Sequence, residues 1–92
     1  MKQKLLYKIY ISGRVQGVGF RWSAASEARI QGITGLVKNL PDGSVYIEAE
    51  GSEEQLKAFI EWCKAGPGFS TVESVKVDSY PPVNYTDFHI EH

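Results

Sequence analysis

Apolar and polar residues alternate along the first part of the chain, from Leu5 to Ser12. Tyr7, Ile9 and Ile11 fall on one face of an extended backbone, whereas Lys8 falls on the other. Because successive side chains of a strand point to opposite faces, this alternation predicts a strand with one buried face.

The pattern changes to a helical spacing after the glycine-rich run GRVQGVGFR. Phe20, Ala24 and Ala28 recur at helical intervals, and the segment from about Arg21 to Gln31 is rich in alanine, glutamate and arginine. This spacing and composition predict an amphipathic helix, which Gly32 ends as a C-cap.

The middle of the chain is typical of a β-hairpin. Two short strands are predicted at Thr34–Lys38 and Ser44–Glu50, and the sequence NLPDG separates them. Proline presets a backbone angle that suits a turn and glycine accepts the left-handed position, so Pro-Asp-Gly favours a tight turn between the strands.

A second helix is predicted directly after this hairpin. Ser52 and Gln55 have the spacing of a capping box, and Gly66 with Pro67 ends the helix. Between these limits, the apolar residues that recur on one helical face are Leu56, Phe59, Ile60 and Cys63.

Two further extended segments complete the chain. The valines of Thr71 to Ser79 alternate irregularly, and Phe88 and Ile90 form a short apolar pair after a Tyr-Pro-Pro break. The resulting order, β-α-β-β-α-β with a short extra C-terminal strand, is typical of an α+β sandwich with two helices on one face of an antiparallel sheet. We therefore predict a single domain over residues 1–92.

The strand before the glycine run and the strand before the NLPDG turn should run in the same direction, because a helix returns the chain between them. Their C-terminal ends then lie at the same edge of the sheet. The glycine run is therefore expected next to the hairpin turn, although the two are far apart in the sequence.

Composition and charge are those of an ordinary globular domain. Apolar residues make up 42% and charged residues 23% of the 92 residues, which predicts a small core with any site at its rim. The formal net charge is 10 − 11 = −1, so neither nucleic acid nor a membrane surface is an expected partner. Cys63 is the single cysteine, which excludes an internal disulfide and a site of several thiolates. With no export signal or membrane-spanning stretch, the cytoplasm is the expected location.

The glycine run matches neither common phosphate-loop pattern. A Walker loop starting at Gly13 needs glycine where Val18 stands, and a dinucleotide fingerprint starting at Gly17 needs glycine where Trp22 stands. Glycines between a strand and a helix can nonetheless turn backbone N–H groups toward an anion at the positive end of the helix dipole. The positive charge of Arg21, in the first helical turn, favours such an anion. The alternative is that the glycines only shape a turn and Arg21 is a solvated charge.

The glycine run and a second motif, GLVKNLPDGSV at residues 35–45, together resemble the paired signature of the acylphosphatases. The resemblance extends through Gly66 and Pro67 to the closing FxI of Phe88 to Ile90. It implies a ferredoxin-like fold and a loop backbone that binds phosphate. The phosphate-binding residues that it implies are Val15, Gln16, Gly17, Val18, Gly19, Phe20 and Arg21. The catalytic residues that it implies are Arg21 and Asn39.

Acylphosphatases hydrolyse the carboxyl-phosphate bond of acyl phosphates, so the resemblance implies a small-molecule acyl phosphate as substrate. The Asn39 amide carries an acceptor and donors, which suit it to orient a water in line with the scissile bond. Because the leaving carboxylate needs no strong acid, we expect direct attack of water without a metal, another cofactor or a covalent phosphoenzyme. A loop that binds mainly the phosphate predicts loose selectivity for the acyl group, and we expect a monomer.

Alternatives remain at this stage. Asn39 precedes a tight turn and can stand there for backbone reasons. The chain can also be a noncatalytic phosphate- or phosphoprotein-binding domain of the same fold. An RNA-recognition domain is disfavoured, because Tyr46 is the only aromatic residue in DGSVYIEAEG, and Glu48 and Glu50 would repel phosphate.

The other chemically distinctive residues are expected to be structural. Cys63 falls on the apolar stripe of the second helix, and Trp22 and Trp62 are interpreted as packing residues. His89 and His92 have no neighbouring cluster of ligand residues, so no metal site is predicted.

Overall fold

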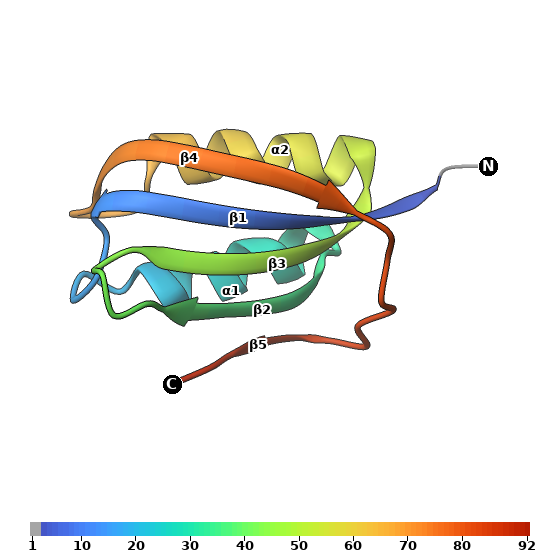
Figure 1. The fold of residues 1–92 in the computed structure, drawn as a ribbon, viewed down its shortest axis with the longest axis horizontal. Helices are drawn as coiled ribbons and strands as arrows, with labels where there is room; N and C mark the ends of the chain where they lie inside the picture. Colours follow the sequence, from blue (N-terminus) through green and yellow to red (C-terminus); the bar gives the residue numbers. More distant parts are fainter. Residues whose placement is uncertain (1–2) are drawn as a thin grey trace.

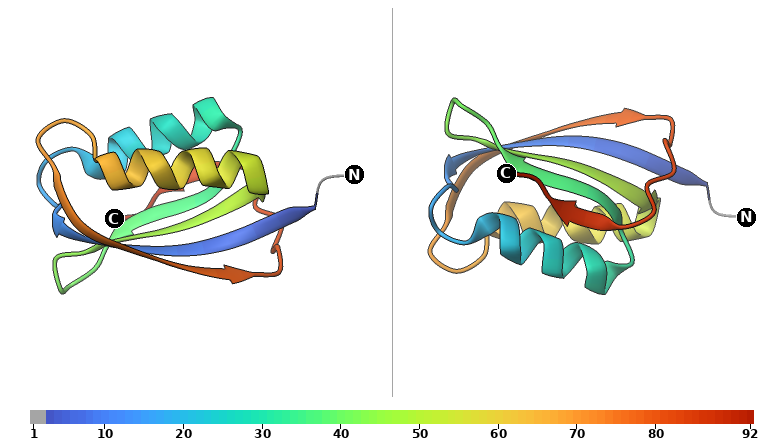
Figure 2. Two further views of the ribbon diagram at one scale, coloured as in Figure 1. Left: turned by 90° about the horizontal axis from the view of Figure 1, so that it is seen from above. Right: turned by 90° about the horizontal axis from the view of Figure 1, so that it is seen from below.

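The computed structural model describes residues 3–92 as a five-stranded sheet with two helices on one of its faces (Figures 1 and 2). The strands are ordered β4-β1-β3-β2-β5 across the sheet. In chain order the elements are β1 (Lys4–Arg14), α1 (Phe20–Gln31), β2 (Thr34–Asn39), β3 (Val45–Ser52), α2 (Glu53–Ala65), β4 (Thr71–Tyr80) and β5 (Phe88–Ile90). The predicted α+β class and order of elements are confirmed.

The short strand β5 makes the sheet mixed. The four longer strands pair antiparallel, as predicted, but β5 pairs parallel with β2. The last residues of β4 and the first residues of β2 lie at the same end of the sheet (Figure 1). Because the chain enters β5 from that end, β5 must run in the same direction as β2. The direction of β5 therefore follows from the connection and not from its own residues.

Gly13 lies in β1 and not in the loop that follows. The pairing of β1 with β4 shifts register between Ser12 and Gly13, which marks a β-bulge. Gly13 has a φ of 127°, and a Cβ atom there would lie 2.1 Å from the carbonyl oxygen of Thr71. Glycine thus lets β1 continue to Arg14, two residues beyond the predicted end.

The core lies between the two helices and the sheet (Figure 2). Ile9 and Ile11 of β1, Val37 of β2 and Ile47 of β3 are fully buried. The buried residues of the helices are Phe20, Ala24, Ala25 and Ala28 in α1 and Leu56, Phe59 and Cys63 in α2. No helix within residues 3–92 has the length and apolar character needed to cross a membrane.

Cys63 has the packing role that the apolar stripe predicts. Its side chain is fully buried in the core, and this burial raises the pKa of the thiol well above its ordinary value. A buried thiol with a raised pKa is a poor nucleophile, because the thiolate is the reactive form.

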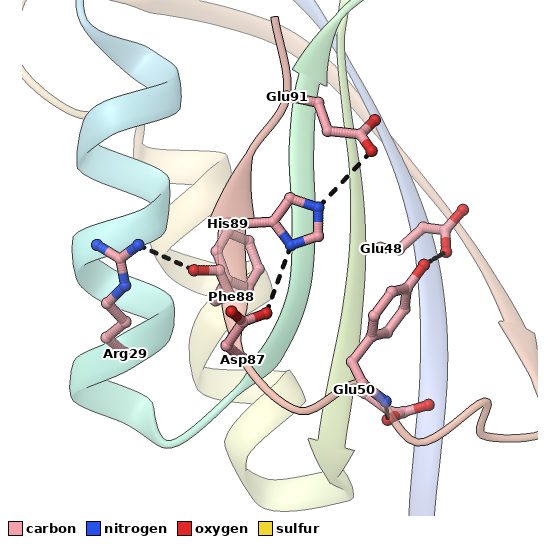
Figure 3. A network of polar contacts seen from close by, with 8 residues as sticks. Arg29, Glu48, Glu50, Asp87, Phe88, His89 and Glu91 are labelled. Atoms are coloured by element: carbon pink, nitrogen blue, oxygen red, sulfur yellow. Dashed lines mark hydrogen bonds and ion pairs between the residues drawn. The ribbon is translucent and has the colours of Figure 1, made fainter.

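The buried carboxylate of Glu50 anchors the connection between β4 and β5. Glu50 is 1% exposed, and its oxygens accept hydrogen bonds from the backbone N–H groups of Val83, Asn84 and Tyr85. The connection turns sharply here, since Asn84 has a left-handed φ of 64°. The carboxylate therefore fixes the segment that leads the chain from one edge of the sheet to the other (Figure 3).

Glu48, two residues earlier on the same face of β3, holds the same connection from a second point. It accepts hydrogen bonds from the hydroxyl groups of Tyr46 and Tyr85. Burial raises the pKa of Glu48, but these hydrogen bonds and the charges of Lys8 and Lys38 outweigh burial, so the net shift is downward. Burial and the bond to Glu48 raise the pKa of Tyr85 to about 12, so its hydroxyl group stays protonated into the alkaline range.

Replacement of Glu50 tests the importance of this anchor. In Glu50→Gln the carboxamide has one acceptor oxygen and presents an NH₂ group to the backbone N–H groups, so we expect a loss of about 2–4 kcal/mol in the free energy of unfolding. Urea unfolding measures the loss. The matched control, Glu61→Gln, removes an exposed carboxylate paired with Lys64 and should lose less than about 0.5 kcal/mol. An equal loss in both variants would contradict the anchoring role.

Candidate active site

The loop between β1 and α1 is fixed in the core at both of its ends. Val15 and Phe20 are each 1% exposed, whereas Gly17 and Gly19 between them face solvent. The two glycines have φ angles of 74° and 79°, which other residues rarely adopt. A Cβ atom at either position would meet open space, so the left-handed backbone and not crowding requires glycine here.

The N-terminus of α1 opens onto this loop. Gly19 is the N-cap residue, and within residues 3–92 no side chain caps the helix and no acidic residue lies in its first turn. The first N–H groups of a helix lack partners within the helix and carry the positive end of its dipole. Arg21 adds a full positive charge to the same turn. This end of α1 is therefore suited to bind an anion.

A side-chain amide joins the loop to the β2–β3 hairpin. The Nε2 atom of Gln16 donates hydrogen bonds to the carbonyl oxygens of Leu40 and Ser44, each at 2.8 Å. Since β1 and β2 both pair antiparallel with β3, they run in the same direction and end at the same edge of the sheet. The predicted meeting of the glycine run and the hairpin turn is confirmed (Figure 1). The bridge by Gln16 has no signal in the sequence pattern.

The hairpin turn is held by its own hydrogen bonds. The carboxylate of Asp42 accepts bonds from the side-chain hydroxyl of Ser44 at 2.5 Å and from its backbone N–H at 2.9 Å. These two bonds lower the pKa of Asp42. The backbone N–H of Leu40 donates to the carbonyl oxygen of Ser44 at 2.9 Å and closes the turn.

Asn39 takes no part in these turn contacts. Within residues 3–92 its Oδ1 atom is buried without a hydrogen-bond partner, and Asn84 is the one non-glycine residue with positive φ. Neither a side-chain hydrogen bond to the turn nor a left-handed backbone therefore accounts for asparagine at this position. Its acceptor atom is not committed to another group of the fold.

The two motifs meet in a cavity of about 280 Å³ at the edge of the sheet. Its lining residues are Val15, Gly17, Gly19, Phe20, Arg21, Trp22, Asn39, Ile90 and His92. The cavity thus contains a glycine-rich backbone, a guanidinium group and an uncommitted amide. Gln16 and Val18, which the resemblance also implied, belong to the loop but do not line the cavity.

A larger hollow of about 560 Å³ lies between α2 and the outer strand β4. Tyr7, Ile60 and Val77 form its apolar wall, and Lys57 and Lys64 stand at its rim. Both lysines form ion pairs with glutamates on α2. No residue of either motif reaches this hollow, so its greater volume does not make it the candidate site.

The C-terminal strand reaches the cavity, a contribution that sequence reasoning missed. The Nη1 atom of Arg21 donates a hydrogen bond to the carbonyl oxygen of Glu91 at 3.1 Å. Arg29, two turns further along α1, donates to the carbonyl oxygen of Phe88 at 2.9 Å (Figure 3). Helix α1 and the end of the chain are therefore held together along one side of the site.

His89 lies in β5, but its side chain does not line the cavity. Its two ring nitrogens lie 3.5 Å from a carboxylate oxygen of Asp87 and 3.6 Å from one of Glu91 (Figure 3). Within residues 3–92 no three His, Cys, Asp or Glu side chains converge so that they could hold a metal ion.

The packing role interpreted for the two tryptophans is right for one and wrong for the other. Trp62 packs between the rings of Phe20 and Phe59, with ring centroids 5.8 Å away in both cases. Trp22 is instead 70% exposed and lies at the cavity. Since one residue of a helix corresponds to about 100°, Trp22 stands about 200° from the buried Phe20 and so leaves the core face.

The fold and the cavity define a small α+β protein with a ferredoxin-like order of elements and a glycine-rich loop before its uncapped first helix. The family model described as Acylphosphatase matches residues 7–90. The chain belongs to the acylphosphatase family, as its two motifs predicted.

Individual relatives are similar to this chain over most of their length. The acylphosphatase of Archaeoglobus fulgidus is 49% identical over 83 residues, which cover 90% of this chain and 93% of that protein. The acylphosphatase of Anaeromyxobacter dehalogenans is 46% identical over 82 residues, covering 89% and 88%. The crystal structure of acylphosphatase from Bacillus subtilis is similar with a TM-score of 0.93 and 42% identity, covering 96% of this chain and 99% of that one.

The Gln16 bridge can be tested through the hairpin that it holds. Gln16→Met keeps the length of the side chain but removes one hydrogen bond from each of the two carbonyl oxygens, which keep their backbone donors Gly43 and Leu40. We therefore expect a loss of about 1–2 kcal/mol in the free energy of unfolding. Hydrogen exchange at the backbone N–H groups of Leu40 and Gly43 should become faster.

The control for this variant is Gln31→Met, which removes a side-chain bond to Glu27 on the same helix. Its loss should stay below about 0.5 kcal/mol, because such pairs on a helix surface are weak. Unchanged exchange at Leu40 and Gly43 in the Gln16 variant would show that the bridge does not hold the hairpin.

Proposed function

We propose that this protein hydrolyses the carboxyl-phosphate bond of acyl phosphates and releases a carboxylate and inorganic phosphate. The observation that carries the proposal is the single cavity in which the uncapped N-terminus of α1, Arg21 and Asn39 meet. Membership of the acylphosphatase family supports the same reaction.

The phosphate group is bound by the loop backbone and by Arg21. In this proposal the loop N–H groups at the positive end of α1 donate to the phosphate, and the guanidinium fork binds two phosphate oxygens with charge-assisted hydrogen bonds. One N–H group of Arg21 is already bonded to the carbonyl oxygen of Glu91, which orients the fork and leaves its other donors for the ligand. In the transition state these donors stabilise the negative charge on the equatorial oxygens.

Asn39 positions the attacking water. Its side chain lies in the same cavity as Arg21, and its buried acceptor atom has no partner within the described part of the chain. A carboxamide is too weak a base to remove a proton, but it can accept a hydrogen bond from water and hold the water oxygen in line with the scissile bond. Positioning alone suffices, because the loose transition state requires little nucleophilic assistance.

The reaction runs without a metal ion, another cofactor or a covalent phosphoenzyme. The leaving carboxylate is stable as an anion at neutral pH, so the chemistry calls for neither a Lewis acid nor a strong general acid. The presence of both Arg21 and Asn39 disfavours the alternative, a noncatalytic phosphate- or phosphoprotein-binding domain. Such a domain would need the phosphate-binding loop and Arg21, here called the phosphate cradle, but not an amide that positions water.

We further propose that the protein works as a monomer in the cytoplasm on small molecules. A single chain brings Arg21, Asn39 and the glycine-rich loop together, so a monomer contains the groups that the proposed reaction needs. Its single cysteine is buried and unpaired, which suits a reducing compartment. Sedimentation at several concentrations tests the monomer, and fractionation of cells tests the location.

Removal of Arg21 should damage both binding and turnover. Arg21→Ala is expected to lower kcat/KM for benzoyl phosphate by about 10²–10³-fold. Arg21→Lys, which keeps the charge but not the guanidinium fork, should retain part of this activity. The rise in Tm on adding inorganic phosphate should disappear in Arg21→Ala. Assays contain excess EDTA, and loss of activity in EDTA alone would contradict the metal-free reaction. The control, Arg14→Ala, removes an exposed arginine at the end of β1 that does not line the cavity and should have no effect.

Removal of Asn39 should separate turnover from binding. Asn39→Ala is expected to lower kcat by about 10²–10³-fold, because the water is no longer positioned, while the effect of phosphate on Tm is retained. Steady-state hydrolysis and thermal unfolding with and without phosphate measure the two properties. If the variant loses stability but its folded fraction keeps its activity, Asn39 serves the turn and not the reaction.

A further inference from the structure

Trp22 is a large apolar side chain in an unusual position. It is 70% exposed on the first turn of α1, directly after the partly buried Arg21, and it lines the candidate active-site cavity. An exposed indole contributes little to the stability of the fold, yet it offers a large flat apolar surface for binding. Its position beside the phosphate cradle therefore points to a ligand.

The cavity is too small to enclose a large substrate. Its volume of about 280 Å³ lies just below the range of about 300–1,000 Å³ typical of pockets that enclose drug-sized ligands. A phosphate held by Gly17, Gly19 and Arg21 occupies its polar end. Any acyl group beyond an acetyl group must then extend toward solvent, past the indole of Trp22.

The side chains around this exit include apolar groups, and none of them is acidic. Ile90 of β5 lines the cavity together with Trp22 of α1, so the two side chains supply apolar surface from two different elements. Arg21 and His92 are the only titratable residues among those that line the cavity, and neither is acidic. An apolar or aromatic acyl group suits these walls, whereas a cationic acyl group would find no acidic side chain to pair with.

We propose that Trp22 binds the acyl group and makes the enzyme favour aromatic acyl phosphates over acetyl phosphate. The inference rests on the proposed function and narrows the loose acyl selectivity that the sequence predicted. The aromatic ring of the acyl group packs against the indole while the phosphate stays in the cradle. Because this contact forms in the ground state as in the transition state, it acts mainly on KM.

The test compares benzoyl phosphate with acetyl phosphate in wild type, Trp22→Ala and Trp22→Phe. We expect Trp22→Ala to raise KM for benzoyl phosphate by about three- to tenfold, from the contribution of an aromatic pair, with a much smaller change for acetyl phosphate. Trp22→Phe keeps a flat ring and should recover most of the preference. The matched control is Phe69→Ala, which removes an 88% exposed ring that does not line the cavity and should leave both substrates unchanged.

A binding measurement keeps this inference separate from the proposed reaction. Phenacylphosphonate and acetonylphosphonate replace the bridging oxygen of the two substrates with CH₂ and cannot be hydrolysed at that position. Calorimetry should show that Trp22→Ala raises the Kd of phenacylphosphonate by about three- to tenfold and the Kd of acetonylphosphonate far less.

Each outcome decides one of the two claims. If wild type binds both phosphonates with the expected preference but hydrolyses neither substrate, the proposed reaction is wrong and Trp22 still binds the apolar group. Equal losses for both ligands in Trp22→Ala, or no loss for either, would overturn the role of Trp22 even where hydrolysis is confirmed.

Discussion

The site depends on one side-chain amide, that of Gln16, which donates to two carbonyl oxygens of the neighbouring hairpin. Arg21 and Asn39 come from separate motifs, and no covalent constraint fixes the distance between their loops. Parallel direction of β1 and β2 brings the two loops to one edge, but strand direction alone leaves loops free to separate. The Gln16 amide ties the loop to the hairpin and so limits the separation of Arg21 from Asn39, the residue that we propose positions the water.

The three glycines of GRVQGVGFR serve two different constraints. Gly13 allows close approach between β1 and β4, where a Cβ atom would collide with the Thr71 carbonyl group. Gly17 and Gly19 instead supply left-handed backbone in the part of the loop that lines the cavity. A single glycine-rich run therefore contains a sheet bulge and the loop that we propose binds the anion, which explains why it has more glycines than a turn requires.

Much of the fold could be predicted from the sequence, because the spacing of apolar residues within one helix or strand indicates which of its faces is buried. The stripe of α2 and the capping box of Ser52 and Gln55 are confirmed. Contacts between distant residues leave no such record: nothing in the pattern around Glu50 indicates that its carboxylate holds residues 83–85. The interpretation of Trp22 as a packing residue is wrong for a related reason, since it rests on the type of side chain, whereas Trp22 lies off the helix face that Phe20 defines. The roles of Arg21 and Asn39 stay predictions, which the geometry of the cavity supports.

The position of Arg21 connects the site to the far end of the sheet. A cation in the first turn of a helix is disfavoured by the helix dipole, so its side chain needs partners outside the helix. One partner is the carbonyl oxygen of Glu91, which follows β5, and β5 lies where it does because Glu50 holds the connection that precedes it. A buried carboxylate at one end of the sheet thereby helps to orient the guanidinium group at the other. The short C-terminal strand thus buries Phe88 in the core, and the residue after it holds Arg21 beside the cavity in which we propose that the anion binds.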